Sequence, residues 1–316
     1  MPFVSYVVTV YNKAMVLPFV TAGLGAQEDD FEREFIFVDD GSTDGSADRL
    51  RELTAGWANV TIVSQTNAGP ARAFNAGIKL ARGDFIKPVD GDDLLFPWAT
   101  ARLLEAIETT GYAVACAPQS ATYDPASSVA DVMASLRRQP GTVVRWDDAL
   151  RRCLRRAQTN PSAWLARSET VRASGGCDER VFIQDYSIEL RLAALGPFAK
   201  SSEPLFLSPE VATERLSANQ GQTLHDMNFA LANFIADRPD LPRDLARLAF
   251  TRAAARAWAW ARRHGGNGPA WREFRLNCGA RLRLLAPSAA NVRATCAAFT
   301  RTNSIRLGDG TRTDPG

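Results

Sequence analysis

Histidine and lysine are scarce in this chain of 316 residues. The two histidines, His225 and His264, leave little material for catalysis by a histidine base or for a histidine-rich metal site. Positive charge comes almost entirely from arginine, since the only lysines are Lys13, Lys79, Lys87 and Lys200. Carboxylates are therefore the first candidates for catalytic groups.

Paired cysteines and long apolar runs are also absent. The cysteines are odd in number, scattered and never in a Cys-x-x-Cys pair, which favours reduced thiols over a disulfide framework or a zinc site: Cys116, Cys153, Cys177, Cys278 and Cys296. No apolar run reaches the roughly 20 residues needed to cross a bilayer. The N-terminus enters a predicted strand without the features of a signal peptide. We expect a cytoplasmic protein, with peripheral contact at the inner face of the cell membrane as an option.

Charge is unevenly distributed along the chain, although the net charge is only +2. From Asp226 onward there are 15 Arg and 7 Asp plus Glu, a surplus of +8 that leaves −6 for the first 225 residues. The basic end could face an anionic membrane leaflet through its helices, or form a solvated face or a dimer interface. No nucleic-acid partner is expected, and the sequence does not predict an oligomeric state.

Apolar strand patterns alternate with helical patterns in the first half of the chain. Buried strands are predicted at 3–10, 34–38, 60–63 and 84–89, and helices at 14–27, 46–55, 70–81 and 97–110. This alternation predicts a doubly wound α/β domain. Lys87 and Pro88 are awkward within a central strand and indicate an edge strand or a bulge.

The second half of the chain has a looser pattern. Residues 117–145 are expected to form loops around a short helix, and elements follow at 147–157, 162–166, 184–194 and 198–208. One or two long helices broken near Pro239 and Pro242 are predicted from 224 to 264, before further Arg-rich helices. We expect a domain at 1–222 that divides at 116, a helical region at 223–306 and a disordered tail at 307–316.

Acidic residues follow two of the predicted strands. Asp39-Asp40 ends the second strand, and Asp90-Gly91-Asp92-Asp93 follows the fourth. Ligands of open α/β sheets bind beyond the carboxyl ends of the strands. Three carboxylates in four positions repel one another, so a cation such as Mg²⁺ or Mn²⁺ would stabilise them. The alternative is a solvated acidic turn.

Two familiar motifs are excluded by single positions. The run from Asp40 to Gly45 matches the first half of an EF-hand loop, but Arg51 stands where that loop needs glutamate. Gly23 and Gly25 are followed by Glu28 where a dinucleotide fingerprint needs its third glycine.

Several ordered motifs resemble the family 2 inverting glycosyltransferases, which have the GT-A fold. The matching stretches are 7–12, 38–44, 67–78, 81–86 and the Asp-x-Asp cluster at 90–93. The likeness resumes at Gly175-Gly176-Cys177-Asp178-Glu179 and at Gln184-Asp185-Tyr186, and covers roughly residues 3–210. It implies a mixed sheet flanked by helices, with a nucleotide-binding half at 1–116 and an acceptor-binding half at 117–222. The helical end would be an extension of this domain. Cys177 replaces the phenylalanine of the family pattern and Gln184 replaces a glutamate.

The resemblance implies a role for each matching residue. Asp185 would be the general base, and Asp92, or else Asp93, would hold the metal ion. Nucleotide contacts would come from Thr9, Tyr11, Asn12, Asp39, Asp40, Arg72 and Asp90. Acceptor contacts would come from Trp164, Gln184 and Tyr186. Asp185 could instead cap the helix that it begins, and the two aromatic residues could instead belong to the core.

The predicted function is a metal-dependent inverting transfer of a sugar from a UDP-, GDP- or dTDP-sugar to a saccharide or lipid-linked acceptor. Such a reaction would serve bacterial surface polysaccharide or glycoconjugate synthesis. The alternative is a catalytically silent GT-A-like scaffold of a membrane-associated assembly, suggested by the departures at Cys177 and Gln184. A nucleotidyltransferase is third, since no Gly-rich phosphate loop lies near the first strand.

Overall fold

The chain divides into two compact units in the computed structural model, which describes residues 1–28, 30–118, 121–210, 219–264 and 270–313. The first unit comprises Met1–Ala149, Gln158–Cys177 and Leu192–Ala212. The second comprises Leu150–Ala157, Asp178–Arg191 and Thr213–Gly316. Residues 150–157 and 178–191, which the sequence placed in the glycosyltransferase domain, thus group with the C-terminal helices.

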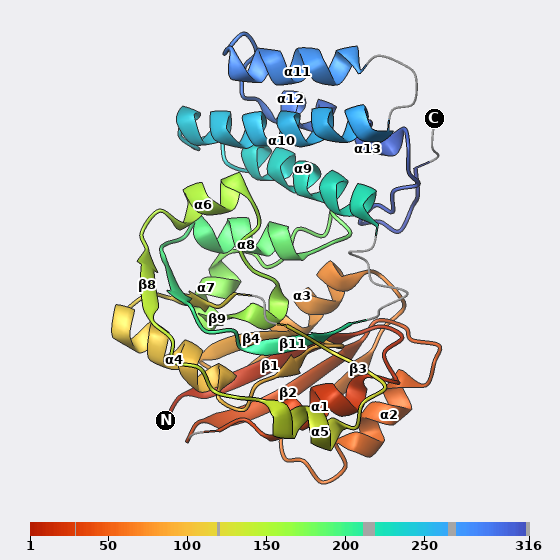
Figure 1. Cartoon of the computed structure of the whole chain (residues 1–316), viewed down its shortest axis with the longest axis vertical. Helices are drawn as coiled ribbons and strands as arrows, with labels where there is room; N and C mark the ends of the chain where they lie inside the picture. The colour runs from red at the N-terminus through yellow and green to blue at the C-terminus, as the bar shows by residue number, and fades with distance from the viewer. Residues whose placement is uncertain (29, 119–120, 211–218, 265–269, 314–316) are drawn as a thin grey trace. The chain divides into compact units, whose positions relative to one another are not determined.

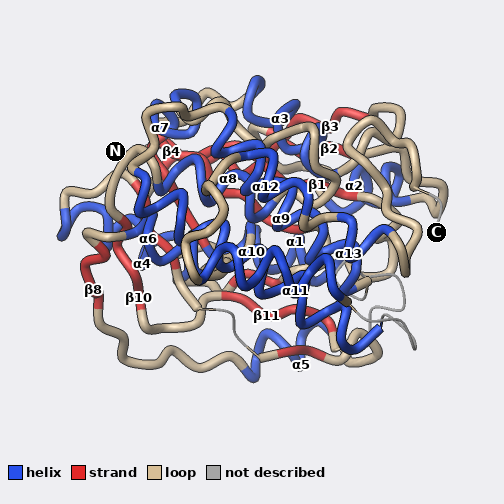
Figure 2. Tube along the Cα trace, turned by 90° about the horizontal axis from the view of Figure 1, so that it is seen from above, coloured by secondary structure: helices blue, strands red, loops and turns tan. Residues whose placement is uncertain are grey.

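An eight-stranded mixed sheet, in the order β3-β2-β1-β4-β9-β6-β10-β8, forms the centre of the first unit (Figure 1). Only β8 and β9 run against the other strands. Figure 2 shows β8 and β10 side by side at one end of the sheet. The strands are β1 (Phe3–Val10), β2 (Glu32–Asp39), β3 (Val60–Ser64), β4 (Phe85–Asp90), β6 (Val114–Cys116), β8 (Val143–Trp146), β9 (Trp164–Arg167) and β10 (Phe198–Ser201).

Helices cover both faces of this sheet, as its apolar strands require. Val4, Tyr6 and Val8 of β1 belong to a core shared with α1, α2 and α4, whereas α3 packs on β1 and β2 from the other face. A small sheet, β5-β11-β7, adjoins α1. These elements are α1 (Leu17–Gly25), α2 (Ser46–Leu53), α3 (Pro70–Leu80), α4 (Ala99–Thr110), α5 (Val129–Ser135), η1 (Pro161–Ala163), α7 (Ser168–Ala173), β5 (Leu94–Leu95), β7 (Thr122–Tyr123) and β11 (Phe206–Pro209).

The structure corrects two expectations about the sheet, the edge-strand alternative for Lys87 and Pro88 and the loop assignment of residues 143–145. β4 is not an edge strand, because it lies between β1 and β9, and Lys87 is completely buried. Its pairing with β9 covers only Phe85 and Ile86, so Lys87 and Pro88 lie beyond that ladder, beside η1. β8 falls within a region predicted to be loops, because its half-exposed residues carry no clear apolar pattern.

The second unit is helical, and its long helices break near Pro239 and Pro242 as predicted. The tail predicted to be disordered is structured to residue 313: Leu307 N–H bonds to the Thr311 carbonyl at 2.8 Å, within a turn closed between Arg306 and Arg312. Residues 314–316 lie outside the described ranges. The helices are α6 (Ala149–Arg155), α8 (Asp185–Ala193), α9 (Gln220–Ala236), α10 (Arg243–His264), α11 (Trp271–Arg281), α12 (Ala289–Ala294) and α13 (Ala297–Thr300).

Gly77 allows α3 to approach the sheet closely. A Cβ atom at this position would lie 2.3 Å from Val7 Cγ1, a separation that only a shift of the helix or the strand could relieve. We expect Gly77→Ala to lower the free energy of unfolding by about 1–3 kcal/mol, measured by urea denaturation. Gly196→Ala is the matched control, since nothing lies within 4 Å of the added atom. Equal stability of the two variants would contradict this packing argument.

Candidate active site

The carboxyl ends of three adjacent strands bring most of the predicted nucleotide-binding residues to one edge of the sheet. Val10 of β1 lies opposite Asp39 of β2, and Thr9 lies opposite Asp90 of β4. Since adjacent strands are about 4.8 Å apart, the Cα atoms of Asp39 and Asp90 lie about 10 Å from each other across β1. We call this the acidic edge; it comprises residues 9–12, 39–40 and 90–93.

Asn12 joins the loops that follow β1 and β2. Its backbone is left-handed, with φ of 52°, a conformation that asparagine tolerates better than most residues. Its N–H donates to Ser42 Oγ at 2.9 Å, and its side-chain oxygen accepts from Thr43 N–H at 2.9 Å. Asn12 therefore holds the two loops together through hydrogen bonds. Tyr11 beside it is exposed.

The two adjacent carboxylates Asp39 and Asp40 have different surroundings, although both are buried. Asp40 accepts from Ala68 N–H and Gly69 N–H, each at 2.9 Å, and from Gln65 Nε2 at 2.8 Å, so both its oxygens hold the loop before α3. Asp39 Oδ1 accepts only from Ser42 N–H, at 3.1 Å, and Oδ2 makes no hydrogen bond to another described residue. Asp39 is thus the better placed of the two to accept a hydrogen bond from a ligand.

The acidic turn at residues 90–93 is packed tightly against β1. A Cβ atom on Gly91 would lie 2.6 Å from the Thr9 carbonyl oxygen, so the turn needs glycine there. Asp93 is buried and accepts from Ser208 Oγ at 2.7 Å. Asp92 is more accessible, and its Oδ2 lies 2.6 Å from Lys13 Nζ. The carboxylates of Asp92 and Asp93 therefore face different partners.

Lys87 lies beneath this turn and is completely enclosed. Its Nζ donates to the carbonyls of Ser162 at 2.7 Å and Pro88 at 2.9 Å. Burial lowers the pKa of Lys87 to about 7, although Asp93 and Asp90 partly oppose this by favouring the charged form. When protonated, Lys87 thus offsets part of the negative charge of the acidic edge from within.

A divalent cation fits this edge if substrate oxygens complete its coordination. Among the residues that the structure describes, no three His, Cys, Asp or Glu side chains converge on one point. Mg²⁺ commonly binds through one or two carboxylates together with substrate phosphates and water. The Asp92 carboxylate already forms an ion pair with the Lys13 ammonium, so a cation can reach its Oδ2 atom. Its accessibility favours Asp92 over Asp93 as the ligand.

Asp185, in the second unit, is the first residue of α8. The Gln184 carbonyl accepts from Ser187 N–H and Ile188 N–H, so Gln184, and not Asp185, occupies the N-cap position before the helix. The Asp185 carboxylate accepts a hydrogen bond from its own backbone N–H and makes none to any other described residue. Burial raises the pKa of Asp185 to about 6. A carboxylate with such a pKa suits the role of a general base better than the role of a helix cap.

The predicted acceptor residues are buried, which is a correction to the sequence-based assignment. Trp164 packs edge-on against Phe74, with ring centroids 6.0 Å apart. Tyr186 donates its hydroxyl to the Cys153 carbonyl at 2.9 Å. Neither ring is available to stack on a sugar, and Gln184 is also buried. Arg72, by contrast, is exposed on the first turn of α3.

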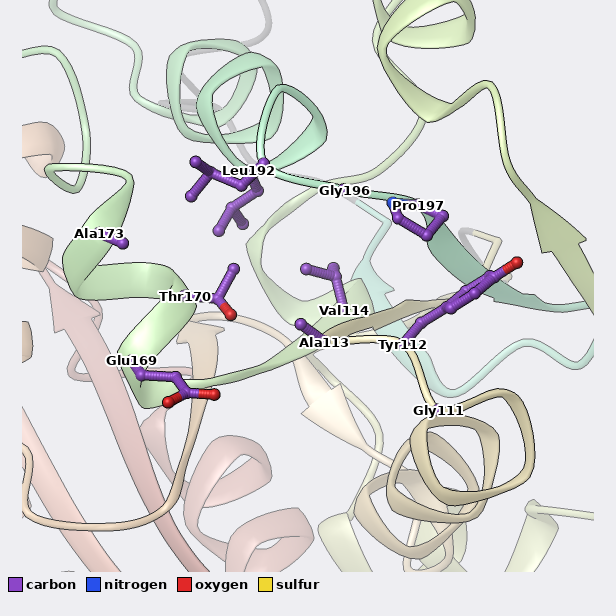
Figure 3. Close-up of a pocket in the computed structure, with 11 residues that line it drawn as sticks. Gly111, Tyr112, Ala113, Val114, Glu169, Thr170, Ala173, Leu192, Gly196 and Pro197 are labelled. Atoms are coloured by element: carbon purple, nitrogen blue, oxygen red, sulfur yellow. The ribbon is translucent and has the colours of Figure 1, made fainter.

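A cavity of about 440 Å³ lies at the opposite edge of the sheet, before the starts of β6 and β10 (Figure 3). Tyr112, Val114 and Pro197 line it together with Thr170 and Glu169 of α7. The strands β6 and β10 run parallel to β1 and β4, so their starts lie away from the acidic edge. None of the predicted site residues lines this cavity.

The fold is that of solved GT-A glycosyltransferases, as the sequence predicted. The structure of S. aureus TarS 1–349 in complex with UDP-GlcNAc matches with a TM-score of 0.63 and 18% identity, over 95% of this chain and 90% of that one. The mannosyltransferase PcManGT from Pyrobaculum calidifontis, in complex with GDP-Man and Mn²⁺, matches with a TM-score of 0.61 and 18% identity, over 94% and 85%. At these identities the likeness concerns the fold alone.

Residues 5–145 match the model of glycosyl transferase family 2. These residues therefore carry the likeness of the chain to that family. The undecaprenyl-phosphate 4-deoxy-4-formamido-L-arabinose transferase of Aeromonas hydrophila is 36% identical over 107 residues, 33% of each chain. The chain spans about a third of the length of the curated relatives that it matches. Among the described helices, none combines the length and hydropathy needed to span a bilayer.

Sequence reasoning missed two cationic groups of the site. Lys13 directly follows the motif at the end of β1, but nothing in the sequence links it to Asp92, 79 positions away. Lys87 stands out in the sequence only as an awkward strand residue. The scarcity of lysine was the one available signal: two of the chain's four lysines lie at the acidic edge.

Proposed function

We propose that this chain is an inverting glycosyltransferase that uses a nucleoside-diphosphate sugar and a divalent cation. The observation that carries the proposal is the acidic edge, where adjacent strands present Asp39, Asp90 and Asp92 at their carboxyl ends. Asp39 Oδ2 would accept a hydrogen bond from the base or ribose, and Asp90 would contact the ribose. Arg72 would contact the nucleotide. Asp40 and Asn12 would hold the loops around it.

Asp92 would hold the divalent cation together with oxygens of the donor diphosphate. Mg²⁺ or Mn²⁺ bound there would supply positive charge to the diphosphate as it leaves. Lys13 would then be released from Asp92 and would be placed near the same phosphates. The acceptor is proposed to be a saccharide or a lipid-linked sugar, the latter because the A. hydrophila relative is named for an undecaprenyl-phosphate substrate.

Asp185 is proposed as the general base. It would take the proton from the acceptor hydroxyl while that oxygen forms a bond to the anomeric carbon. In the same step the bond from that carbon to the diphosphate oxygen breaks, and the nucleoside diphosphate leaves with the electron pair. One displacement of this kind inverts the configuration and needs no covalent intermediate on the protein.

A thermal-shift panel of UDP-, GDP- and dTDP-sugars with and without Mn²⁺ tests the donor proposal. Ligands that bind only the native state raise the melting temperature, by an amount that grows with concentration above Kd. We expect one nucleotide class to raise it, and Mn²⁺ to enlarge the effect. If no nucleotide sugar changes the melting temperature, the proposal fails. Binding without turnover in an acceptor screen would support the silent scaffold instead.

A further inference from the structure

Helix α11 in the second unit has an inverted distribution of polar and apolar side chains. Trp271 is 63% exposed and Leu282, which caps the helix, is 67% exposed, whereas Glu273 and Asn277 are almost completely buried. Glu273 accepts from Arg301 at 2.6 Å on this inner side. Folding alone would favour the opposite arrangement, because burying apolar surface stabilises and burying polar groups is costly.

The outward side of α11 is one continuous stripe. With 3.6 residues per turn, positions 271, 274, 275, 278 and 282 lie on the same side of a helix. They carry Trp271, Phe274, Arg275, Cys278 and Leu282. Arg283 follows with a left-handed backbone, φ of 62°, and Leu284 beyond it is 75% exposed. We call Trp271, Phe274, Leu282 and Leu284, with the arginines around them, the α11 face.

Aromatic contacts connect the α11 face to the end of α10. The ring of Phe274 lies 5.9 Å from that of Trp271 and 6.0 Å from that of Trp258 on α10. The guanidinium of Arg262 stacks over Trp258, 5.1 Å from the ring centre. Figure 1 shows α10 and α11 running alongside each other. Both helices therefore contribute to one aromatic surface.

The charge of this surface has a single sign. Six exposed arginines lie at the end of α10, along α11 and directly after it: Arg262, Arg263, Arg272, Arg275, Arg281 and Arg283. The only acidic residue between positions 252 and 286 is Glu273, which is buried and paired. The α11 face thus combines exposed tryptophan, phenylalanine and leucine with uncompensated positive charge.

We propose that the α11 face binds the surface of an anionic lipid bilayer. A bilayer surface suits both kinds of side chain in the α11 face. Its anionic headgroups neutralise the arginines, and the boundary of its acyl chains accommodates tryptophan and leucine. A second copy of the chain would bring six more arginines against these six. Nucleic-acid phosphates would neutralise the arginines but leave Leu282 and Leu284 in water. The proposal depends on the helical unit alone, so it can fail independently of the proposed transferase reaction.

Sedimentation of the full chain with sucrose-loaded vesicles tests the proposal. The wild type should bind vesicles of phosphatidylcholine with phosphatidylglycerol more tightly than phosphatidylcholine alone, and salt should weaken the binding. Neutralising Arg272, Arg275 and Arg281 to glutamine should weaken it about a hundredfold, at about 1 kcal/mol or fivefold per charge. The triple variant Trp271→Ser, Leu282→Ser, Leu284→Ser should also lose binding.

The matched control is Met15→Ser with Arg138→Gln, an exposed apolar residue and an exposed arginine of the first unit. This control should bind vesicles like the wild type. Circular dichroism checks that the variants are folded, which their exposed positions favour. Failure of the wild type to bind anionic vesicles at low salt would overturn the proposal, as would equal binding by the serine variant. A dimer that the serine variant dissociates, without vesicle binding, would overturn it in favour of an interface between copies.

Discussion

Asp185→Asn is expected to lower kcat by a factor of about 10² to 10⁴ while leaving the Kd of the donor unchanged. The reason is that asparagine keeps the shape of the side chain but cannot take the proton of the acceptor hydroxyl. Steady-state kinetics with the donor and acceptor found by screening, together with donor titration by calorimetry, measure the two quantities. Asp240→Asn is the control, since Asp240 is an exposed loop carboxylate of the same unit.

The raised pKa of Asp185 gives this prediction two further readouts. Because the base must be ionised, kcat/KM should fall tenfold per pH unit below about pH 6 and be constant above it, and the variant should lose this acid limb. A raised folded-state pKa also means that ionised Asp185 destabilises the fold, progressively as pH rises from about 4 to about 6. Asp185→Asn should therefore raise the melting temperature at pH 8. A lower melting temperature with unchanged kcat would assign Asp185 a structural role.

The parts of this protein that the sequence predicts are those controlled by local patterns. Strand β1 was predicted at its observed limits because its residues are apolar on both faces of the sheet. The same alternation of strands and helices placed Asp39 and Asp90 at strand ends, and a parallel sheet necessarily brings such ends to one edge. The acidic edge therefore follows from local sequence patterns together with the geometry of parallel strands.

What the sequence does not predict depends on contacts between distant segments. Asp39 and Asp40 look equivalent in sequence, and only the loop at 65–69 distinguishes them by occupying Asp40. Trp164 is an aromatic residue in a motif, and its burial against Phe74 could not be inferred from its type. Likewise, composition indicated a basic C-terminal region, but not that α11 turns its tryptophan outward and its glutamate inward.

Asp92→Asn is expected to remove the effect of Mn²⁺ on donor binding, because a neutral amide is a much weaker ligand for a hard cation than a carboxylate. In the thermal-shift assay, the wild type should respond to the nucleotide sugar more strongly with Mn²⁺ than without it. The variant should respond equally with and without Mn²⁺, and its Kd for the donor in Mn²⁺ should rise at least about a hundredfold. Asp93→Asn should have a smaller effect on Mn²⁺ binding, because Asp93 is buried against Ser208.

Lys13→Met is the matched variant on the other side of the ion pair. The Lys13 ammonium and a divalent cation would compete for the same oxygen, Asp92 Oδ2, so removing the ammonium should strengthen Mn²⁺ binding in the absence of nucleotide. Mn²⁺ binding followed by electron paramagnetic resonance measures this without relying on activity. Asp92→Asn and Lys13→Met both break the partly exposed ion pair between these two residues. If the variants acted only by lowering stability, they would change Mn²⁺ affinity in the same direction. Opposite changes in Mn²⁺ affinity would identify Asp92 as the ligand and Lys13 as its competitor, whereas parallel losses would contradict the assignment.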